Sequence, residues 1–179
     1  MQLSSVHAFI FDIDGTLVDS NELHVDSWDR AFQRFGKQFS REQLRAQIGK
    51  GDDNKPSVLA SSGKKTDTKY YIDLLKVGDL IDGYVSGDDA DSSKPAPDIF
   101  AASLEKLGDI SPADAVTVGD TRFDVEAARR AGLKTIAFLC GGTAESILRR
   151  AGAIAIYHDP ADFLARYKKL VAHAAASQT

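Results

Sequence analysis

Short apolar runs rich in β-branched residues alternate along the chain with amphipathic helical patterns. The apolar runs predict strands over residues 6–11, 57–61, 83–87, 115–119, 134–139 and 153–158. Helical periodicity predicts helices over residues 66–78, 97–108, 121–132, 143–152 and 160–174. Strands that alternate with helices are typical of a parallel sheet covered by helices on both faces, so the pattern predicts an α/β fold.

Residues 20–54 interrupt this alternation. The stretch NELHVDSWDRAFQRFG places Trp28, Phe32 and Phe35 at helical spacing, and SREQLRAQIG begins with a capping box. The polar stretch GDDNKPS then leads into the next predicted strand. We therefore predict a helical insertion over residues 20–54 in a core formed by residues 1–19 and 55–179.

Composition and charge narrow the class of protein. The chain has 179 residues, 43% of them hydrophobic, which suffices for one well-buried domain with a small appendage. A net charge of -4 gives no basic excess, so we expect neither a nucleic-acid nor a membrane partner. The amino terminus lacks a signal-peptide pattern and no apolar run is long enough to span a bilayer, so we expect a soluble, cytoplasmic protein.

The single cysteine, Cys140, excludes an intrachain disulfide framework. It follows the apolar residues AFL, and this setting predicts a buried structural thiol.

The first predicted strand ends in two aspartates, Asp12 and Asp14, within FDIDGTLVDS. Two carboxylates at the mouth of a buried strand lose solvation and repel each other, so this arrangement needs a compensating cation or a shared proton. A simpler explanation makes both aspartates turn formers beside Gly15.

Three further motifs follow in order: LASSG, SSKPAPDIF and VGDTRFDVEAA. Each has a purely structural explanation, in which Ser61 caps a helix, Lys94 is a solvated loop residue, and Thr121 and Asp124 form a capping box. If the strand ends converge, however, Asp12, Asp14 and Asp120 offer oxygen ligands of the kind that Mg²⁺ prefers. The cation would then relieve the repulsion between the carboxylates.

The order of DxDGT, a hydrophobic run ending in Ser, KPAPDIF and VGDxxxD resembles the haloacid dehalogenase-like superfamily of phosphohydrolases. The resemblance lies in the branch of phosphoglycolate phosphatases and β-phosphoglucomutase, and it covers nearly the whole chain. It implies a Rossmann-like three-layer fold with strand order 3-2-1-4-5, helices on both faces and a small, truncated helical cap.

The resemblance also implies catalytic roles. Asp12 would be the nucleophile that forms an aspartyl-phosphate, and Asp14 would protonate the leaving oxygen and then activate water. The Asp12 carboxylate, the Asp14 main-chain carbonyl and Asp120 would hold Mg²⁺. Asp124 would support the metal through water or orient Lys94.

Substrate contacts follow from the same resemblance. Ser61 and its neighbour Ser62 would cradle the transferring phosphate oxygens, and Lys94 would add a positive charge beside them. His24 matches a position that closes over substrate. Trp28 also matches such a position, although we favour a core anchor for it.

The sequence departs from the family between the first and second motifs. The chain passes almost directly from QIGKGDDN into VLASSG, so the second half of the cap and the helix that leads into the strand have no counterpart. A reduced cap predicts an open site with weak, broad activity, because a complete cap excludes water and contacts the remote part of the substrate.

We therefore predict a Mg²⁺-dependent phosphatase for a small phosphorylated metabolite such as a sugar phosphate or a phosphoglycolate-like ester, as a monomer or weak homodimer. A mutase is an alternative, although GKGDD offers no clear basic residue for a second phosphate. A catalytically silent relative that binds phosphate and Mg²⁺ is another alternative. A signalling receiver domain is disfavoured, because receivers place the phospho-accepting aspartate on a middle strand.

Overall fold

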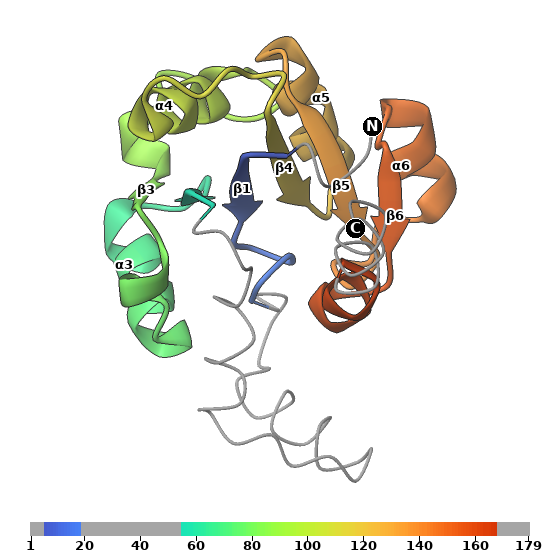
Figure 1. Cartoon of the computed structure of the whole chain (residues 1–179), viewed down its shortest axis with the longest axis horizontal. Coiled ribbons are helices and arrows are strands. Elements are labelled where there is room, and N and C mark those ends of the chain that lie inside the picture. Colours follow the sequence, from blue (N-terminus) through green and yellow to red (C-terminus); the bar gives the residue numbers. More distant parts are fainter. Residues whose placement is uncertain (1–5, 19–54, 168–179) are drawn as a thin grey trace, which may run out of the picture.

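The computed structural model of the protein describes residues 6–18 and 55–167. Within them, parallel strands form one sheet in the order β3-β2-β1-β4-β5-β6 (Figure 1). The strands are β1 (Ala8–Asp12), β2 (Ser57–Ala60), β3 (Gly83–Val85), β4 (Ala115–Gly119), β5 (Lys134–Phe138) and β6 (Ala155–Tyr157). The predicted order 3-2-1-4-5 is confirmed, and the last predicted strand pairs with β5 as a sixth member.

Helices connect successive strands. The α-helices are α3 (Lys65–Leu75), α4 (Asp98–Leu107), α5 (Arg122–Arg130) and α6 (Glu145–Ala151), and short 3-10 turns form η2 (Gly78–Leu80) and η3 (Gly87–Asp89). Residues 160–167 are also helical. The first four predicted helices are confirmed as α3, α4, α5 and α6. Their observed ends differ from the predicted ends by one to three residues. Residues 168–174 of the predicted helix over 160–174 lie outside the described residues, so that part stays a prediction.

The side chains of β1 alternate between two helical layers. Ala8 and Ile10 lie in a buried cluster with Ile99 and Phe100 of α4. Phe9 points to the opposite face, where its ring packs edge-on against Phe163 with 6.3 Å between ring centroids. Because alternate residues of a strand face opposite sides of a sheet, these contacts place the sheet between two layers of helices.

A capping box fixes the start of α5. The Thr121 hydroxyl accepts a hydrogen bond from the Asp124 backbone N–H at 3.2 Å, and the Asp124 carboxylate accepts one from the Thr121 backbone N–H at 2.9 Å. The predicted capping box is therefore confirmed. It also holds the Asp124 side chain at the carboxyl end of β4.

The prediction of a buried Cys140 is wrong, because this residue is exposed. Strand β5 ends at Phe138, and the chain then turns, with the Gly142 backbone N–H donating to the Leu139 carbonyl at 3.0 Å. The turn places Cys140 outside the sheet. The sequence pattern does not show this turn, because the apolar residues continue without a break up to Cys140.

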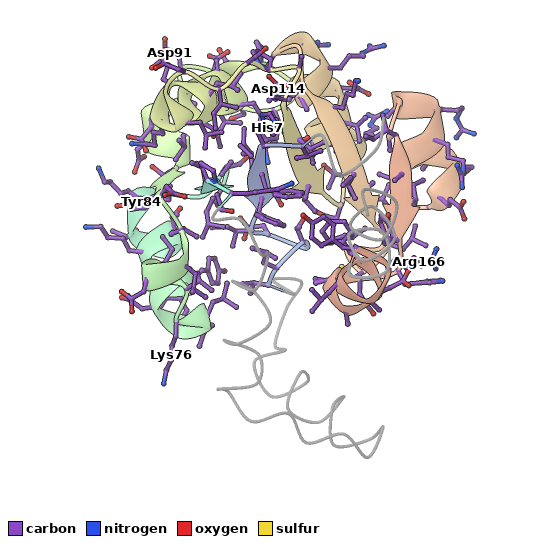
Figure 2. All side chains as sticks on the ribbon, viewed as in Figure 1. His7, Lys76, Tyr84, Asp91, Asp114 and Arg166 are labelled. Atoms are coloured by element: carbon purple, nitrogen blue, oxygen red, sulfur yellow. The ribbon has the colours of Figure 1, made fainter. Side chains whose placement is uncertain are left out.

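Charged side chains such as Lys76, Asp91 and Arg166 point outward from the described part of the protein (Figure 2). Within that part, no helix is long and apolar enough to cross a membrane. The predicted insertion over residues 20–54, including His24 and Trp28, lies outside the described residues and stays a prediction.

Candidate active site

The carboxyl ends of β1, β2 and β4 meet at one edge of the sheet. Asp12 is the last residue of β1 and pairs in register with Ala60, the last residue of β2. Ser61 follows β2 directly, and Asp120 follows β4 directly. Parallel strands bring such residues to the same crevice, as predicted for ligand sites in open α/β sheets.

Lys94 joins two buried carboxylates. Its Nζ lies 2.5 Å from Asp12 Oδ1 and 2.6 Å from Asp124 Oδ1. All three side chains are at most 8% exposed, so water screens these ion pairs weakly. The loop between η3 and α4 carries Lys94 into this position, so the structure brings Asp12, Lys94 and Asp124 together.

One lysine cannot neutralise both carboxylates. Burial raises the pKa of Asp12 to about 8, against the opposing charge of Lys94, and the nearby Asp124 and Asp120 carboxylates add to the rise. Burial acts on Asp124 in the same direction, but the charge and hydrogen bond of Lys94 together with the hydrogen bonds from Thr121 outweigh it and lower the pKa of Asp124. Burial also opposes the charge of Lys94, yet Asp12 and Asp124 together hold the pKa of Lys94 above its ordinary value.

Thr16 links Asp12 to Asp120. Its hydroxyl lies 3.2 Å from Asp12 Oδ2 and 3.0 Å from Asp120 Oδ1. Burial and the nearby Asp124 carboxylate raise the pKa of Asp120 to about 6. A hydroxyl has one proton, so it donates to one of the two carboxylates at a time.

Asp14 and Ser61 form a second contact at the mouth of the crevice. The Ser61 hydroxyl donates to Asp14 Oδ2 at 2.7 Å and accepts from the Gly63 backbone N–H at 3.0 Å. Ser62 is exposed and lines a small cavity that also contacts Lys94. Ser62 and Lys94, both predicted to contact phosphate, therefore line one small cavity, and Ser61 directly precedes Ser62 in the chain.

The acidic cluster has the donor chemistry of a divalent cation site. Carboxylate oxygens of Asp12, Asp120 and Asp124 all lie within 4.8 Å of one another, and all three residues are buried. Oxygen donors of this kind fit Mg²⁺, which takes few carboxylates and keeps several waters. Both oxygens of Asp124 already contact Lys94 or Thr121, so its geometry fits the supporting role better than direct ligation.

Some residues of the site were not predicted. Thr16 lies inside the DIDGT motif, yet nothing in the sequence pattern signals that its hydroxyl reaches two aspartates. Thr121 was predicted only as a helix cap, but its hydroxyl also donates to Asp124 Oδ2 at 2.5 Å. These contacts depend on the paths of loops, which hydrophobic periodicity does not encode.

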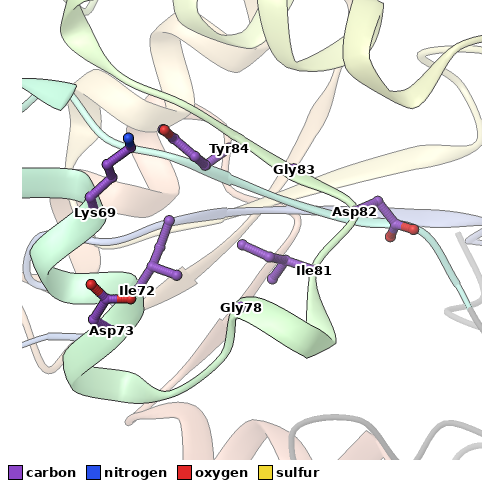
Figure 3. A pocket seen from close by; sticks show the side chains of 8 residues that line it. All are labelled: Lys69, Ile72, Asp73, Gly78, Ile81, Asp82, Gly83 and Tyr84. Carbon is purple, nitrogen blue, oxygen red and sulfur yellow. The ribbon is translucent and has the colours of Figure 1, made fainter.

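A larger pocket lies elsewhere in the described part of the protein. It has a volume of about 310 Å³ and lies between α3 and the segment that enters β3 (Figure 3). It is lined by Lys69, Ile72, Asp73, Gly78, Ile81, Asp82, Gly83 and Tyr84. Because no predicted site residue lines it, the acidic crevice remains the candidate active site.

Comparison with known proteins gives a family and several relatives. The haloacid dehalogenase-like hydrolase family matches residues 9–55 and 54–138. The pyrophosphatase PpaX of Bacillus velezensis is 29% identical over an alignment of 177 positions. This alignment covers 73% of this chain and 82% of that protein. The phosphoglycolate phosphatase of Aquifex aeolicus is 40% identical over 74 residues, which cover 41% of this chain and 34% of that protein.

Solved structures share the fold. A hydrolase from Pseudomonas syringae has a TM-score of 0.71 at 26% identity, covering 90% of this chain and 98% of that one. A protein from Thermotoga maritima assigned as a β-phosphoglucomutase has a TM-score of 0.69 at 22% identity, covering 92% of this chain and 99% of that one. The family match, which spans more than half of the sequence, shows that the chain belongs to the haloacid dehalogenase-like hydrolase family.

Proposed function

We propose that this protein is a Mg²⁺-dependent phosphatase that hydrolyses small phosphomonoesters through an aspartyl-phosphate on Asp12. The observation that carries the proposal is the buried Asp12 carboxylate, placed 2.5 Å from Lys94 and within 4.8 Å of two further carboxylates. Asp12 and Asp120 would hold the cation with the Asp14 main-chain carbonyl, and Asp124 would orient Lys94. The bound Mg²⁺ would screen the anionic nucleophile from the anionic phosphate.

In the first step, an Asp12 oxygen attacks phosphorus and the bond to the ester oxygen breaks. Asp14 gives its proton to the departing oxygen. In the second step, Asp14 takes a proton from water, the water oxygen bonds to phosphorus, and the bond to Asp12 breaks to release inorganic phosphate. Lys94, which stays protonated, contributes a fixed positive charge beside the transferring group throughout.

Ser61 fits a role in phosphate binding. Its hydroxyl contacts Asp14, and its Gly63 partner gives the loop after β2 a tight turn. Together with Ser62 it would present hydroxyl and backbone N–H groups to the phosphate oxygens. We retain His24 as a substrate contact on the basis of the sequence alone.

We propose that residues 20–54 form a reduced cap inserted into a core of residues 1–19 and 55–179. Two observations support a shortened segment. The two family matches meet at residues 54–55. The alignment with PpaX of Bacillus cereus runs over 179 positions yet takes in only 74% of this chain, so many of its positions hold residues of PpaX alone.

Hydrolysis of p-nitrophenyl phosphate tests the function. We expect turnover with Mg²⁺, loss of turnover with chelator, and loss in the Asp12→Asn variant, while the exposed control Asp91→Asn keeps the wild-type rate. A folded protein that binds Mg²⁺ without Asp12-dependent turnover would favour the silent relative. Transfer of phosphate within a sugar phosphate, without net release, would favour the mutase.

The substrate panel should include sugar phosphates, phosphoglycolate and pyrophosphate, the last because several relatives are named pyrophosphatases. A small phosphorylated metabolite is the proposed partner. The monomeric or weakly dimeric state and the cytoplasmic location stay predictions.

A further inference from the structure

The carboxylate of Asp120 lies in a narrow slot between two glycines. Gly141 belongs to the loop after β5, and Gly15 belongs to the DIDGT turn after β1. A Cβ atom at Gly141 would lie 1.7 Å from Asp120 Oδ2, and a Cβ atom at Gly15 would lie 2.6 Å from the same oxygen. Two backbone segments that are far apart in sequence therefore enclose one carboxylate.

The need for glycine at position 141 does not come from the conformation of its own backbone. Gly15 has a φ of +77°, which favours glycine for conformational reasons, whereas Gly141 has no positive φ. Alanine at Gly141 would instead meet Asp120 Cγ at 2.4 Å and Asp120 Cβ at 2.7 Å. Rotation of the Asp120 side chain about its Cα–Cβ bond would move Cγ and the oxygens away, but it would leave Cβ in place, so the loop would also have to move.

Two further contacts fix the slot. The Cys140 thiol donates to the Gly15 carbonyl at 3.3 Å, which ties the loop after β5 to the DIDGT turn. The Thr16 hydroxyl lies 3.0 Å from Asp120 Oδ1 and so fixes the other carboxylate oxygen. Asp120 Oδ2 thus lies nearest the glycines, and Asp120 Oδ1 contacts Thr16.

We infer that Gly15, Thr16 and Gly141, which we call the Asp120 slot, are positioning residues that set the direction in which Asp120 presents its carboxylate to a divalent cation. This inference rests on the proposed function. Groups that orient a metal ligand typically contribute about 10-fold to 100-fold to metal affinity or activity. The slot would achieve this partly through the absence of a side chain at position 141, since any Cβ atom there would overlap the Asp120 carboxylate in its present orientation.

Direct metal binding tests the Asp120 slot. Free Mn²⁺, which accepts the same oxygen ligands as Mg²⁺, is titrated into the full chain and followed by electron paramagnetic resonance. We expect Gly141→Ala to weaken Mn²⁺ binding by about tenfold or more. Gly78→Ala is the matched control, because Gly78 also lacks a positive φ and its added Cβ would meet only Ile72, at 3.7 Å. It should bind Mn²⁺ as the wild type does.

Wild-type Mn²⁺ affinity in a folded Gly141→Ala protein would overturn the inference, and so would a wild type that binds no Mn²⁺. If Gly141→Ala does not fold, Thr16→Val replaces it, since it removes the hydroxyl from the same slot, and unchanged affinity again overturns the inference. A wild type that binds Mn²⁺ but shows no Asp12-dependent hydrolysis would reject the proposed phosphatase, while the metal titration still decides the role of the slot.

Discussion

At the scale of single residues, the site has more buried negative charge than positive charge. Lys94 contacts Asp12 and Asp124, and Asp120 has no lysine or arginine within ion-pair distance among the described residues. Protonation can relieve this excess in the metal-free protein, as the raised pKa values of Asp12 and Asp120 indicate. A divalent cation would relieve it without a proton, so protons and metal compete for the same oxygens.

This competition predicts a pH-dependent stabilisation by Mg²⁺. The pKa values of Asp12 and Asp120 rise from 3.8 to about 8 and about 6 in the folded protein, so folding favours their protonated forms. Their contribution to metal-free stability is therefore complete below the unfolded value and is lost as pH rises through the folded values. We expect saturating Mg²⁺ to raise the melting temperature little at about pH 5 and much more at about pH 8, because deprotonated carboxylates bind the cation.

Calorimetric melts with Mg²⁺ and with chelator measure this difference. The control variant Asp91→Asn should keep the pH dependence, whereas Asp120→Asn should reduce it. An equal rise in melting temperature at both pH values would contradict the competition.

Asp14 gives a second prediction at the residue scale. A general acid contributes about 10²-fold to 10⁴-fold when the leaving group is a poor one. We therefore expect Asp14→Asn to slow hydrolysis of an alkyl phosphate much more than first-turnover release of p-nitrophenol, which leaves readily without a proton. Rapid-quench and stopped-flow measurements compare the two substrates, and an equal loss for both would argue against Asp14 as the acid.

At the scale of elements, the first residues of helices and the last residues of strands position the side chains of the candidate active site. Thr121 begins α5 and at the same time accepts and donates hydrogen bonds that hold the Asp124 carboxylate. The same carboxylate then contacts Lys94, from a different loop. A helix cap is thereby connected to Lys94, the residue that forms an ion pair with Asp12.

Removal of this cap should affect both stability and turnover. We expect Thr121→Ala to lower the free energy of unfolding by about 1 kcal/mol, the usual cost of a lost N-cap, and to lower kcat because Asp124 no longer holds Lys94 as firmly. Thr66→Ala is a suitable control, because Thr66 is exposed and its hydroxyl donates only to the neighbouring Asp67 among the described residues. The N-cap of α3 is Lys64, so Thr66 does not cap that helix. Urea unfolding and steady-state kinetics measure the two effects, and a stability loss with unchanged kcat would limit Thr121 to its structural role.

At the scale of the whole molecule, the proposed reduced cap over residues 20–54 would have consequences for selectivity. Binding of the remote part of a substrate is what distinguishes one phosphomonoester from another, since the phosphate itself is common to all. With a reduced cap we expect kcat/KM values for several phosphomonoesters to lie within about 100-fold of one another. Measurement of kcat/KM over a substrate panel gives this range. A kcat/KM for one sugar phosphate that exceeds all others by far more than about 100-fold would contradict the prediction.

The sequence predicted the larger features well because they depend on periodicity. The range 115–119 coincides with β4, and the predicted capping box at Thr121 is present. The motif aspartates meet because strand ends of a parallel sheet share an edge. By contrast, the exposure of Cys140 and the contact of Gly141 with Asp120 depend on how one turn leaves β5, and no repeating pattern of residues specifies that path.

The separation of the site residues along the chain has a kinetic consequence. Lys94 and Asp12 are 82 residues apart, and Thr16 and Asp120 are 104 residues apart. Contacts across such long loops form late, because the entropy of closing the loops opposes them until β1 and β4 have paired. Interactions that are absent from the folding transition state slow unfolding and leave the folding rate nearly unchanged. A cation bound at this crevice would therefore prolong the lifetime of the native protein without hastening its formation.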